Sequence, residues 1–430
     1  MIGFSHRNLD NREFLLVFVG LALLLRLLLM PFFAHVDLFS EYRRIVFAIE
    51  NGHLLDNSHR LAVYYIEMLF AWIATWFIPI TDGLFALPDP TQSTAGTTDY
   101  GFFLTDPYVY RYLFFFKLPY LIFDLATAAL IWRFVDDVRL RRLALLIWLF
   151  NPLTLFSTYI FGRFEVISLF FLCLTALNLK HHRYLLGALS FAVALWCREI
   201  NLLFAPFFLL SVIDIKEHWF KNGIIIGLAS LIIIAFVVLP AHIITAFGGN
   251  TQLFLDPETA RSTDALNKLL SLGYHWFYPI IIGIMALLFY AWEMLDRPHA
   301  ERFVISCALV LFVYFAFNVH SVHYAAWLML FPILSIQYGA RVIMPCIALW
   351  FAWLVLWLLK TDAGVFTLFL AAPLHTDFIG TGVFPNFFNA HIASGQFDLY
   401  QAIQMMRAVF ASVLGYFAYR LIKRSRVSGE

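Results

Sequence analysis

The sequence predicts an all-α polytopic membrane protein, with roughly ten to twelve transmembrane helices in a single domain that covers residues 1–430. Hydrophobic residues make up 62% of the chain and charged residues only 13%. A soluble fold of this length cannot bury so much apolar surface, because the buried fraction grows slowly with chain length. Lipid must cover the rest, and the 48 phenylalanines suit lipid-facing and interfacial positions.

Apolar runs recur along the chain, and most approach the roughly 20 residues that cross a bilayer as a helix. The alternation that is typical of membrane β-strands is not visible, and isolated apolar runs in lipid satisfy their backbone only as helices. The runs lie at about 14–34, 114–135, 143–161, 164–179, 184–213, 222–240, 274–295, 303–318, 324–338, 342–359 and 403–422.

Net charge and cysteine usage narrow the function classes. The formal net charge is +1, which gives no case for a nucleic-acid partner. The four cysteines lie in apolar runs without a CxxC pair, so we interpret them as small core residues rather than ligands or disulfides. The polar N-terminus and the lack of a small-residue cleavage site indicate that the first apolar run is a helix, not a cleaved signal peptide.

Lysine and arginine near the ends of the runs predict the orientation, because these residues concentrate in cytoplasmic loops. With the N-terminus in the cytoplasm, the basic segments on that side are Arg133–Arg142, Lys180–Arg183, Lys216–Lys221, Arg297–Arg302, Arg341 and the tail from Lys423 to Arg426. Three long segments then lie outside, at 35–113, 241–273 and 360–402. The first and largest is expected to carry helices at about 36–51 and 61–80, the latter in the interface plane.

The basic segments before and after 184–213 lie on the same side of the membrane only if this segment crosses the membrane an even number of times. The segment is too short for two full spans, and it carries Arg198 and Glu199 at its centre. We therefore predict a short or broken helical hairpin whose tip holds this charged pair, since broken helices are tolerated where they line a protein cavity.

Several polar residues lie on the predicted outer side. A charged side chain next to the membrane is energetically costly, so such residues are candidates for a function or for ion pairs. They are Asp37, Glu41, Asp99, Asp106, Arg111, Lys117, Arg163, Glu165, Arg198, Glu199, His320 and His323. A carboxylate there can act as a general base on a hydroxyl, and arginine or lysine can hold a phosphate. Desolvation at that depth is expected to raise the pKa of the carboxylate and make it a better base.

Several segments resemble the GT-C superfamily of polytopic glycosyltransferases. Asp37 matches the acidic residue that those enzymes carry just after the first helix, with Glu41 as a nearby second acid. The stretch from Tyr112 to Leu125 looks like the Lys-Leu-Pro…Phe-Asp-Leu entry to the second helix in polyprenyl- or dolichyl-phosphate-sugar-dependent mannosyltransferases. Trp148–Glu165 looks like their Asn-Pro helix and Gly-containing outer turn, and Asn318–Pro332 resembles their His/Gln-Tyr…Trp…Pro segment.

The resemblance covers about two-thirds of the chain, with departures. The outer turn has Arg163 and Glu165 where Gln and an acid are expected, and the first loop lacks an Asp-Asp or Asp-x-Asp pair. The resemblance implies an inverting transferase that moves a hexose, with mannose favoured, from a polyprenyl- or dolichyl-phosphate carrier. The acceptor would be a glycolipid or lipid-linked glycan on the outer or lumenal face. No obligate metal ion or other cofactor is expected, since such donors resemble those used without metal.

The expected roles follow residue by residue. Asp37 and Glu41 are the catalytic candidates; Lys117, Arg111, Arg163 and Arg198 are the donor-phosphate candidates; Glu165, Glu199, His320, His323 and Tyr324 are the substrate-binding candidates. Plain alternatives stay open: a solvated acid at Asp37, a snorkelling Lys117, mutual ion pairs at Arg163–Glu165 and Arg198–Glu199, and an interfacial histidine pair.

Other functions also stay open. A transporter or flippase of a lipid-linked sugar would use the same phosphate-binding charges, but transporters often show internal repeats and none is visible here. A non-catalytic scaffold subunit of a glycosylation complex is a third reading. The membrane is expected to be a plasma membrane with an outward-facing site or the endoplasmic reticulum with a lumenal one.

Overall fold

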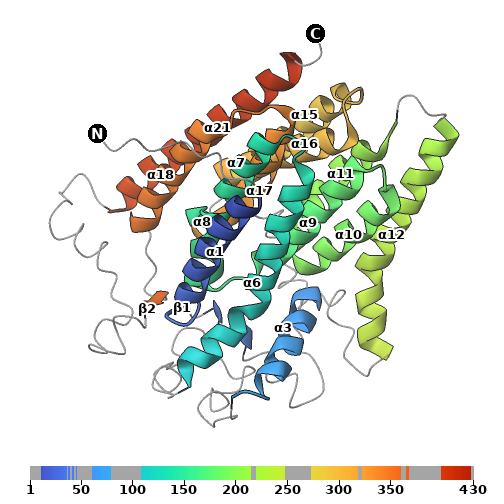
Figure 1. Ribbon diagram of the computed structural model, residues 1–430. Coiled ribbons are helices and arrows are strands. Elements are labelled where there is room, and N and C mark those ends of the chain that lie inside the picture. Colours follow the sequence, from blue (N-terminus) through green and yellow to red (C-terminus); the bar gives the residue numbers. More distant parts are fainter. Residues whose placement is uncertain are drawn as a thin grey trace.

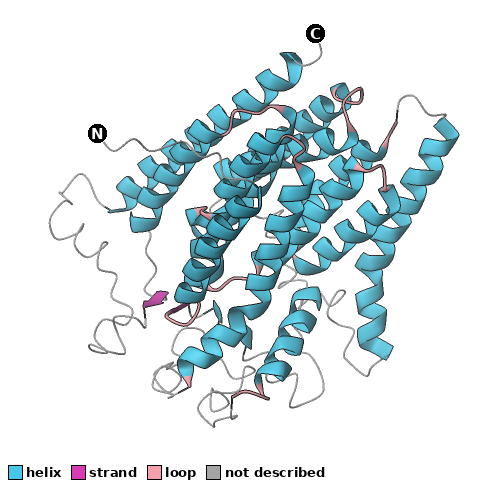
Figure 2. Ribbon diagram, viewed as in Figure 1, coloured by secondary structure: helices cyan, strands magenta, loops and turns pink. Residues whose placement is uncertain are grey.

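A computed structural model describes residues 11–35, 37–38, 41–42, 45, 61–78, 108–214, 219–246, 273–317, 322–359, 365–367 and 399–427. These residues are almost entirely helical (Figures 1 and 2). The principal helices are α1 (Asn11–Leu29), α3 (Leu61–Ala74), α6 (Val109–Phe134), α7 (Val138–Leu149), α9 (Glu165–Lys180), α10 (Tyr184–Cys197), α11 (Ala205–Val212), α12 (Trp219–Ala246), α15 (Gly273–Glu293), α16 (His299–Phe317), α17 (Trp327–Leu334), α18 (Ile343–Leu359) and α21 (Leu399–Val427).

Short elements join these helices. The four-residue α8 (Pro152–Leu155) continues into a π-helical turn, η2 (Phe156–Phe161), and the 3-10 turns are η3 (Glu199–Phe204), η4 (Val322–Ala326) and η5 (Ser335–Tyr338). Two three-residue strands, β1 (Phe33–His35) and β2 (Val365–Thr367), pair antiparallel with Ala34 opposite Phe366. The all-α class is confirmed, with this one small strand pair as an addition.

Among the described residues, four helical stretches are long and apolar enough to cross a membrane. They are Val109–Phe134, Val138–Phe161, His299–Phe317 and Leu399–Lys423, and six further apolar helices are shorter. Large apolar side chains also face outward, such as Phe289 of α15, which is 71% exposed. Such faces are covered by lipid in a membrane protein. The chain is therefore a helical membrane protein, and the count of roughly ten to twelve crossings stays a prediction.

Each predicted apolar run is mostly helical in the structure, although the run at 14–34 ends in the β1 strand and the run at 143–161 is interrupted between α7 and α8. Local chemistry explains where some helices begin. Asp137 caps α7 by accepting hydrogen bonds from the backbone N–H groups of Arg139 and Leu140. The Asn151 side chain caps α8 by accepting from the backbone N–H of Leu153, and Pro152 occupies the first turn, so this pair starts a helix.

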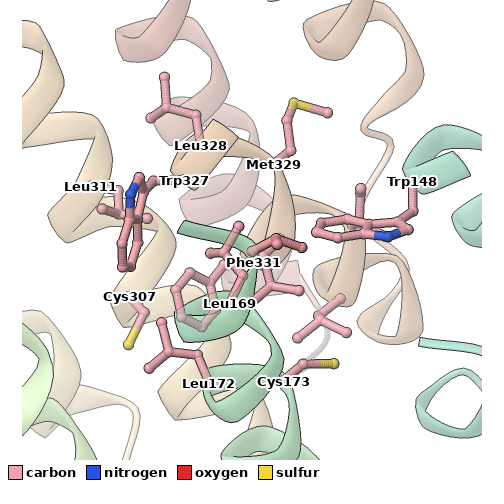
Figure 3. Packing of buried hydrophobic residues seen from close by; sticks show 14 of the residues in the cluster. Trp148, Leu169, Leu172, Cys173, Cys307, Leu311, Trp327, Leu328, Met329 and Phe331 are labelled. Carbon is pink, nitrogen blue, oxygen red and sulfur yellow. The ribbon is translucent and has the colours of Figure 1, made fainter. Parts of the chain in front are cut away.

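The apolar core lies where α7, α9, α16 and α17 meet, and Figure 3 shows part of it. All eight residues of α17 are buried. Trp148 of α7, Leu169 and Leu172 of α9, and Phe331 of α17 all belong to this buried cluster (Figure 3). Because α17 is surrounded by other helices, it carries the neighbouring η4 turn on a fixed support.

A buried polar network ties α1 to α6, α7 and η2. The Arg26 guanidinium donates to Asp124 Oδ2 at 2.6 Å and to the Leu149 carbonyl at 2.9 Å. Asp124 also accepts from Trp148 Nε1 at 2.8 Å and from the Tyr159 hydroxyl at 2.7 Å. These contacts from three side chains give Asp124 a structural role in joining the helices.

The predicted hairpin at 184–213 is confirmed. Helix α10 ends at Arg198, whose backbone is extended (φ −160°, ψ 130°), and η3 and α11 return from there. The two ends of the hairpin that lie away from its tip meet through α16. The Tyr184 hydroxyl lies 2.9 Å from His299 Nε2, while His299 Nδ1 lies 2.7 Å from the Ser211 carbonyl. Arg198 thus lies at the tip, and the side chain of Glu199 lies outside the described residues.

Helix α3 packs against α6 through a polar contact. The hydroxyl of Tyr120 donates to Oε1 of the fully buried Glu67 at 2.5 Å. The other face of α3 exposes Trp72 and, in the turn that follows, Trp76. With 14 residues α3 is shorter than a span, and its placement in the interface plane stays a prediction.

Candidate functional site

One end of the bundle, where β1 lies in Figure 1, carries a group of charged side chains from separate parts of the chain. We call this end the site end, and the end of the α6–α7 turn the opposite end. The group consists of Asp37, Glu41, Arg163, Glu165 and Arg198, and we call it the Arg163 cluster.

The turn after η2 positions Arg163 and Glu165. Gly162 ends the π-helical turn in the left-handed conformation (φ +84°), and the backbone N–H of Arg163 donates to the Ser157 carbonyl at 2.9 Å. A Cβ at Gly162 would meet Leu38 Cδ2 at 2.9 Å, so glycine is also required by the close approach of the segment after β1. Helix α9 then begins at Glu165.

Arg163 lies between three carboxylates. Its Nη1 is 3.1 Å from Asp37 Oδ2 and 3.9 Å from Glu41 Oε1, and its Nε is 3.6 Å from Glu165 Oε1. Burial opposes the charge of Arg163, yet the neighbouring carboxylates, Glu165 foremost, raise its pKa above the usual value. The predicted Arg163–Glu165 pair is therefore present, as one part of a larger cluster.

Arg198 reaches the cluster from the hairpin tip. Its Nη2 donates to Glu165 Oε1 at 3.0 Å, and its guanidinium lies 5.1 Å from the Tyr324 ring centroid and 5.3 Å from that of Phe164. Glu165 therefore bridges the two arginines. Three carboxylates and two guanidinium groups give the ionised cluster a formal charge of −1.

A column of aromatic rings lies beside these charges. His35 stacks on Phe161 with centroids 3.7 Å apart, Phe161 lies 4.0 Å from His323, and His323 lies 4.1 Å from Tyr324. His35 Nδ1 is also 3.1 Å from the backbone nitrogen and 3.5 Å from Oδ1 of Asp37. The sequence analysis assigned no role to His35, although its position two residues before Asp37 was a usable signal.

Asp37 is the accessible acid of the cluster. Its side chain is 39% exposed, against 8% for Glu41 and 1% for Glu165. Burial acts to raise the pKa of Asp37, but hydrogen bonding with His35 and the charge of Arg163 outweigh it, so the pKa lies below its ordinary value. The upward pKa shift that was expected at this carboxylate was wrong, because spacing along the chain does not show that the buried Arg163 lies 3.1 Å away.

Lys117 is fully buried, and its ammonium donates to three backbone carbonyls. They belong to Met30 at 2.9 Å, Tyr159 at 2.8 Å and Phe33. A lysine ammonium has three N–H donors, so these contacts use its full capacity. We therefore assign Lys117 to the joint between α1, β1, η2 and α6, and leave it out of the proposed phosphate site.

The remaining candidates divide between the cluster and other places. Arg111 is exposed on α6, with its guanidinium 5.5 Å from the Tyr108 ring centroid, and within the described chain it makes no contact with the Arg163 cluster. His320, Asp99 and Asp106 lie outside the described residues, as does the Glu199 side chain. Of the substrate-binding candidates, Glu165, His323 and Tyr324 lie in or beside the cluster.

Within the described ranges, no three His, Cys, Asp or Glu side chains are grouped in a way that would hold a metal ion. In the Arg163 cluster the cation between the carboxylates is a guanidinium. What this arrangement offers chemically is an accessible ionised carboxylate, a second arginine nearby and a buried imidazole.

Comparisons with known proteins leave the family open. No protein-family model matches the chain. No curated protein matches it in sequence. The resemblance to the GT-C superfamily therefore stays a prediction from the motifs quoted above.

Proposed function

We propose that the protein is an inverting glycosyltransferase of GT-C type, working at the outer or lumenal face of its membrane. It would move a hexose, with mannose favoured, from a polyprenyl- or dolichyl-phosphate carrier to a glycolipid or lipid-linked glycan. One observation carries this proposal: an accessible carboxylate, Asp37, is held by Arg163 next to a second arginine, at one end of a lipid-embedded helical bundle. Both substrates are lipid-borne, so a site at the membrane surface suits them.

Asp37 is the proposed base. The acceptor hydroxyl gives its proton to Asp37 Oδ, its oxygen forms the new bond to the anomeric carbon, and the bond from that carbon to the carrier phosphate breaks. The lipid phosphate leaves with the electron pair, and the configuration at the carbon inverts. The low pKa of Asp37 makes it a weak base toward a free hydroxyl, so proton transfer is expected late, when the attacking oxygen has become acidic.

The two arginines are expected to have different tasks. Arg163 already lies against three carboxylates, so we assign it to holding the Asp37 carboxylate in place. Arg198, at the hairpin tip beside Tyr324, is the proposed partner of the donor phosphate. Its planar guanidinium suits the two-point binding of a phosphate, and charge held there would stabilise the leaving group.

The deciding experiment measures sugar transfer by purified protein in nanodiscs. Labelled polyprenyl-phosphate mannose is supplied with a membrane lipid extract, and wild type is compared with Asp37→Asn. Asp296→Asn is the matched control, because Asp296 is 70% exposed and lies in the turn before α16 at the opposite end. A labelled glycolipid from wild type and the control, reduced about 100-fold or more in Asp37→Asn, is expected for loss of a general base.

Other outcomes would redirect the proposal. If Asp37→Asn makes as much product as wild type, the protein is still a transferase, but Asp37 is not the base and Glu41 becomes the candidate. The absence of product with mannosyl and glucosyl donors, together with movement of the labelled lipid between leaflets, would replace the transferase with a flippase.

A further inference from the structure

His323 is a buried imidazole whose ring nitrogens are unused. Its side chain belongs to η4 and is 4% exposed, between the rings of Phe161 and Tyr324. Within the described structure, neither Nδ1 nor Nε2 has a hydrogen-bond partner. Buried polar side chains are nearly always hydrogen-bonded. Two buried ring nitrogens without a partner beside a candidate site therefore indicate that a ligand supplies their hydrogen bonds.

The neighbours of His323 determine which kind of group fits. Burial and the positive charge of Arg163 both lower the pKa of His323 well below its ordinary value, so the ring is neutral. A neutral imidazole offers one N–H donor and one acceptor nitrogen. Phosphate oxygens only accept, and Arg198 is their proposed partner, whereas a hydroxyl group both donates and accepts. The unpaired donor and acceptor nitrogens of His323 therefore match a sugar hydroxyl better than a phosphate oxygen.

Tyr324 connects His323 to the proposed phosphate site. The Tyr324 ring centroid lies 4.1 Å from that of His323 and 5.1 Å from the Arg198 guanidinium, on a turn held by the buried helix α17. Tyr324 thus contacts both residues, and a hexose attached to a phosphate on Arg198 would reach the imidazole by extending past this ring.

We propose that His323 binds a hydroxyl group of the transferred hexose and so distinguishes a sugar-bearing lipid phosphate from the bare carrier. This inference rests on the proposed function for the identity of the donor. It divides the donor between two residues, with the phosphate on Arg198 and the sugar on His323.

The test measures binding to the full chain in nanodiscs without acceptor. The probes are polyprenyl phosphate, polyprenyl-phosphate mannose and octyl mannoside. His323→Phe keeps the ring in the aromatic column but removes both nitrogens, and His323→Gln restores one donor and one acceptor. His181→Phe, at an exposed position of the opposite end, is the matched control. His323→Phe is expected to weaken both sugar-bearing probes about tenfold and to leave polyprenyl phosphate unchanged, with partial recovery in His323→Gln.

Three results would overturn the inference: equal weakening of both polyprenyl probes by His323→Phe, no weakening of any probe, or no preference of the wild type for the sugar-bearing lipid. The transfer assay above separates this inference from the function itself. If octyl mannoside binding depends on His323 but the protein shows no transfer activity, the proposed transferase function is wrong and the sugar-binding role of His323 stands. If His323→Phe changes neither transfer nor the binding of the probes, the transferase function stands and the sugar-binding role of His323 is wrong.

Discussion

At the scale of single residues, Arg163 organises the site more than any other side chain. It is buried and within 4.0 Å of three carboxylates, two of which are nearly buried themselves. A buried ion pair is costly to form, and removing one partner leaves uncompensated charge behind. The Arg163 cluster therefore depends on charge balance, and its members cannot be changed independently.

Substitution of Arg163 tests this dependence. Arg163→Met is expected to lower the free energy of unfolding by about 3 kcal/mol, because Asp37, Glu41 and Glu165 would face one another without a cation. Adding Glu165→Gln should recover part of the loss, since it removes one of the like charges. Thermal unfolding in detergent measures both effects, with the exposed Arg111→Met as the control. A double variant that is no more stable than Arg163→Met would argue against charge balance as the cause.

The low pKa of Asp37 predicts how the protein responds to acid. The pKa is lower in the folded state than the ordinary value of 3.8, so ionised Asp37 stabilises the fold above that pH. This contribution is lost as pH falls below about 4 and the carboxylate becomes protonated. Transfer should accordingly show no acid limb from Asp37 between about pH 5 and 8. Rate profiles of wild type and Glu41→Gln check this, and an acid limb near pH 6 that persists in Glu41→Gln would contradict the assignment.

At the scale of elements, the sequence predicted much more of the helical layout than of the contacts. The apolar runs located the helices, and Arg198 at the centre of an apolar segment located the hairpin tip, because both signals are local. The Arg163 cluster was predicted only as residues sharing one face of the membrane. Which charges pair depends on how η2, α9 and the hairpin pack, and spacing along the chain carries no such information. For this reason the carbonyl contacts of Lys117 and the lowered pKa of Asp37 were not predicted.

Lys117 joins elements, and its substitution separates that task from phosphate binding. Lys117→Met would leave the carbonyls of Met30, Phe33 and Tyr159 buried without a donor, and about 3 kcal/mol of stability should be lost. Protein that remains folded should bind polyprenyl phosphate with unchanged affinity. Thermal unfolding and lipid binding are measured side by side, with the exposed Lys423→Met as the control. Unchanged stability with weakened phosphate binding would return Lys117 to the phosphate site.

At the scale of the whole molecule, the two ends of the bundle differ in character. The site end concentrates acids, arginines and a buried histidine, His323, whose ring nitrogens have no hydrogen-bond partner among the described residues. At the opposite end, charged side chains stabilise the turns. Lys180 Nζ pairs with Asp136 Oδ1 at 2.7 Å. Arg302 donates to the backbone carbonyls of Leu210 and Ile213 at 3.0 and 2.6 Å. The orientation, with the basic turns in the cytoplasm and the site end outside, stays a prediction from the lysine and arginine pattern.

Cysteine labelling tests that orientation directly. The four native cysteines are buried and free, so they should react little with a bulky maleimide that does not cross membranes. A single cysteine at the exposed Arg111, near the start of α6, should be labelled in intact cells if the site end faces outward. A single cysteine at the exposed His181, in the turn between α9 and α10, should be labelled only after permeabilisation. The reverse pattern would place the Arg163 cluster in the cytoplasm. The donor would then be used on the cytoplasmic leaflet, and the proposed outer or lumenal location of the site would be wrong.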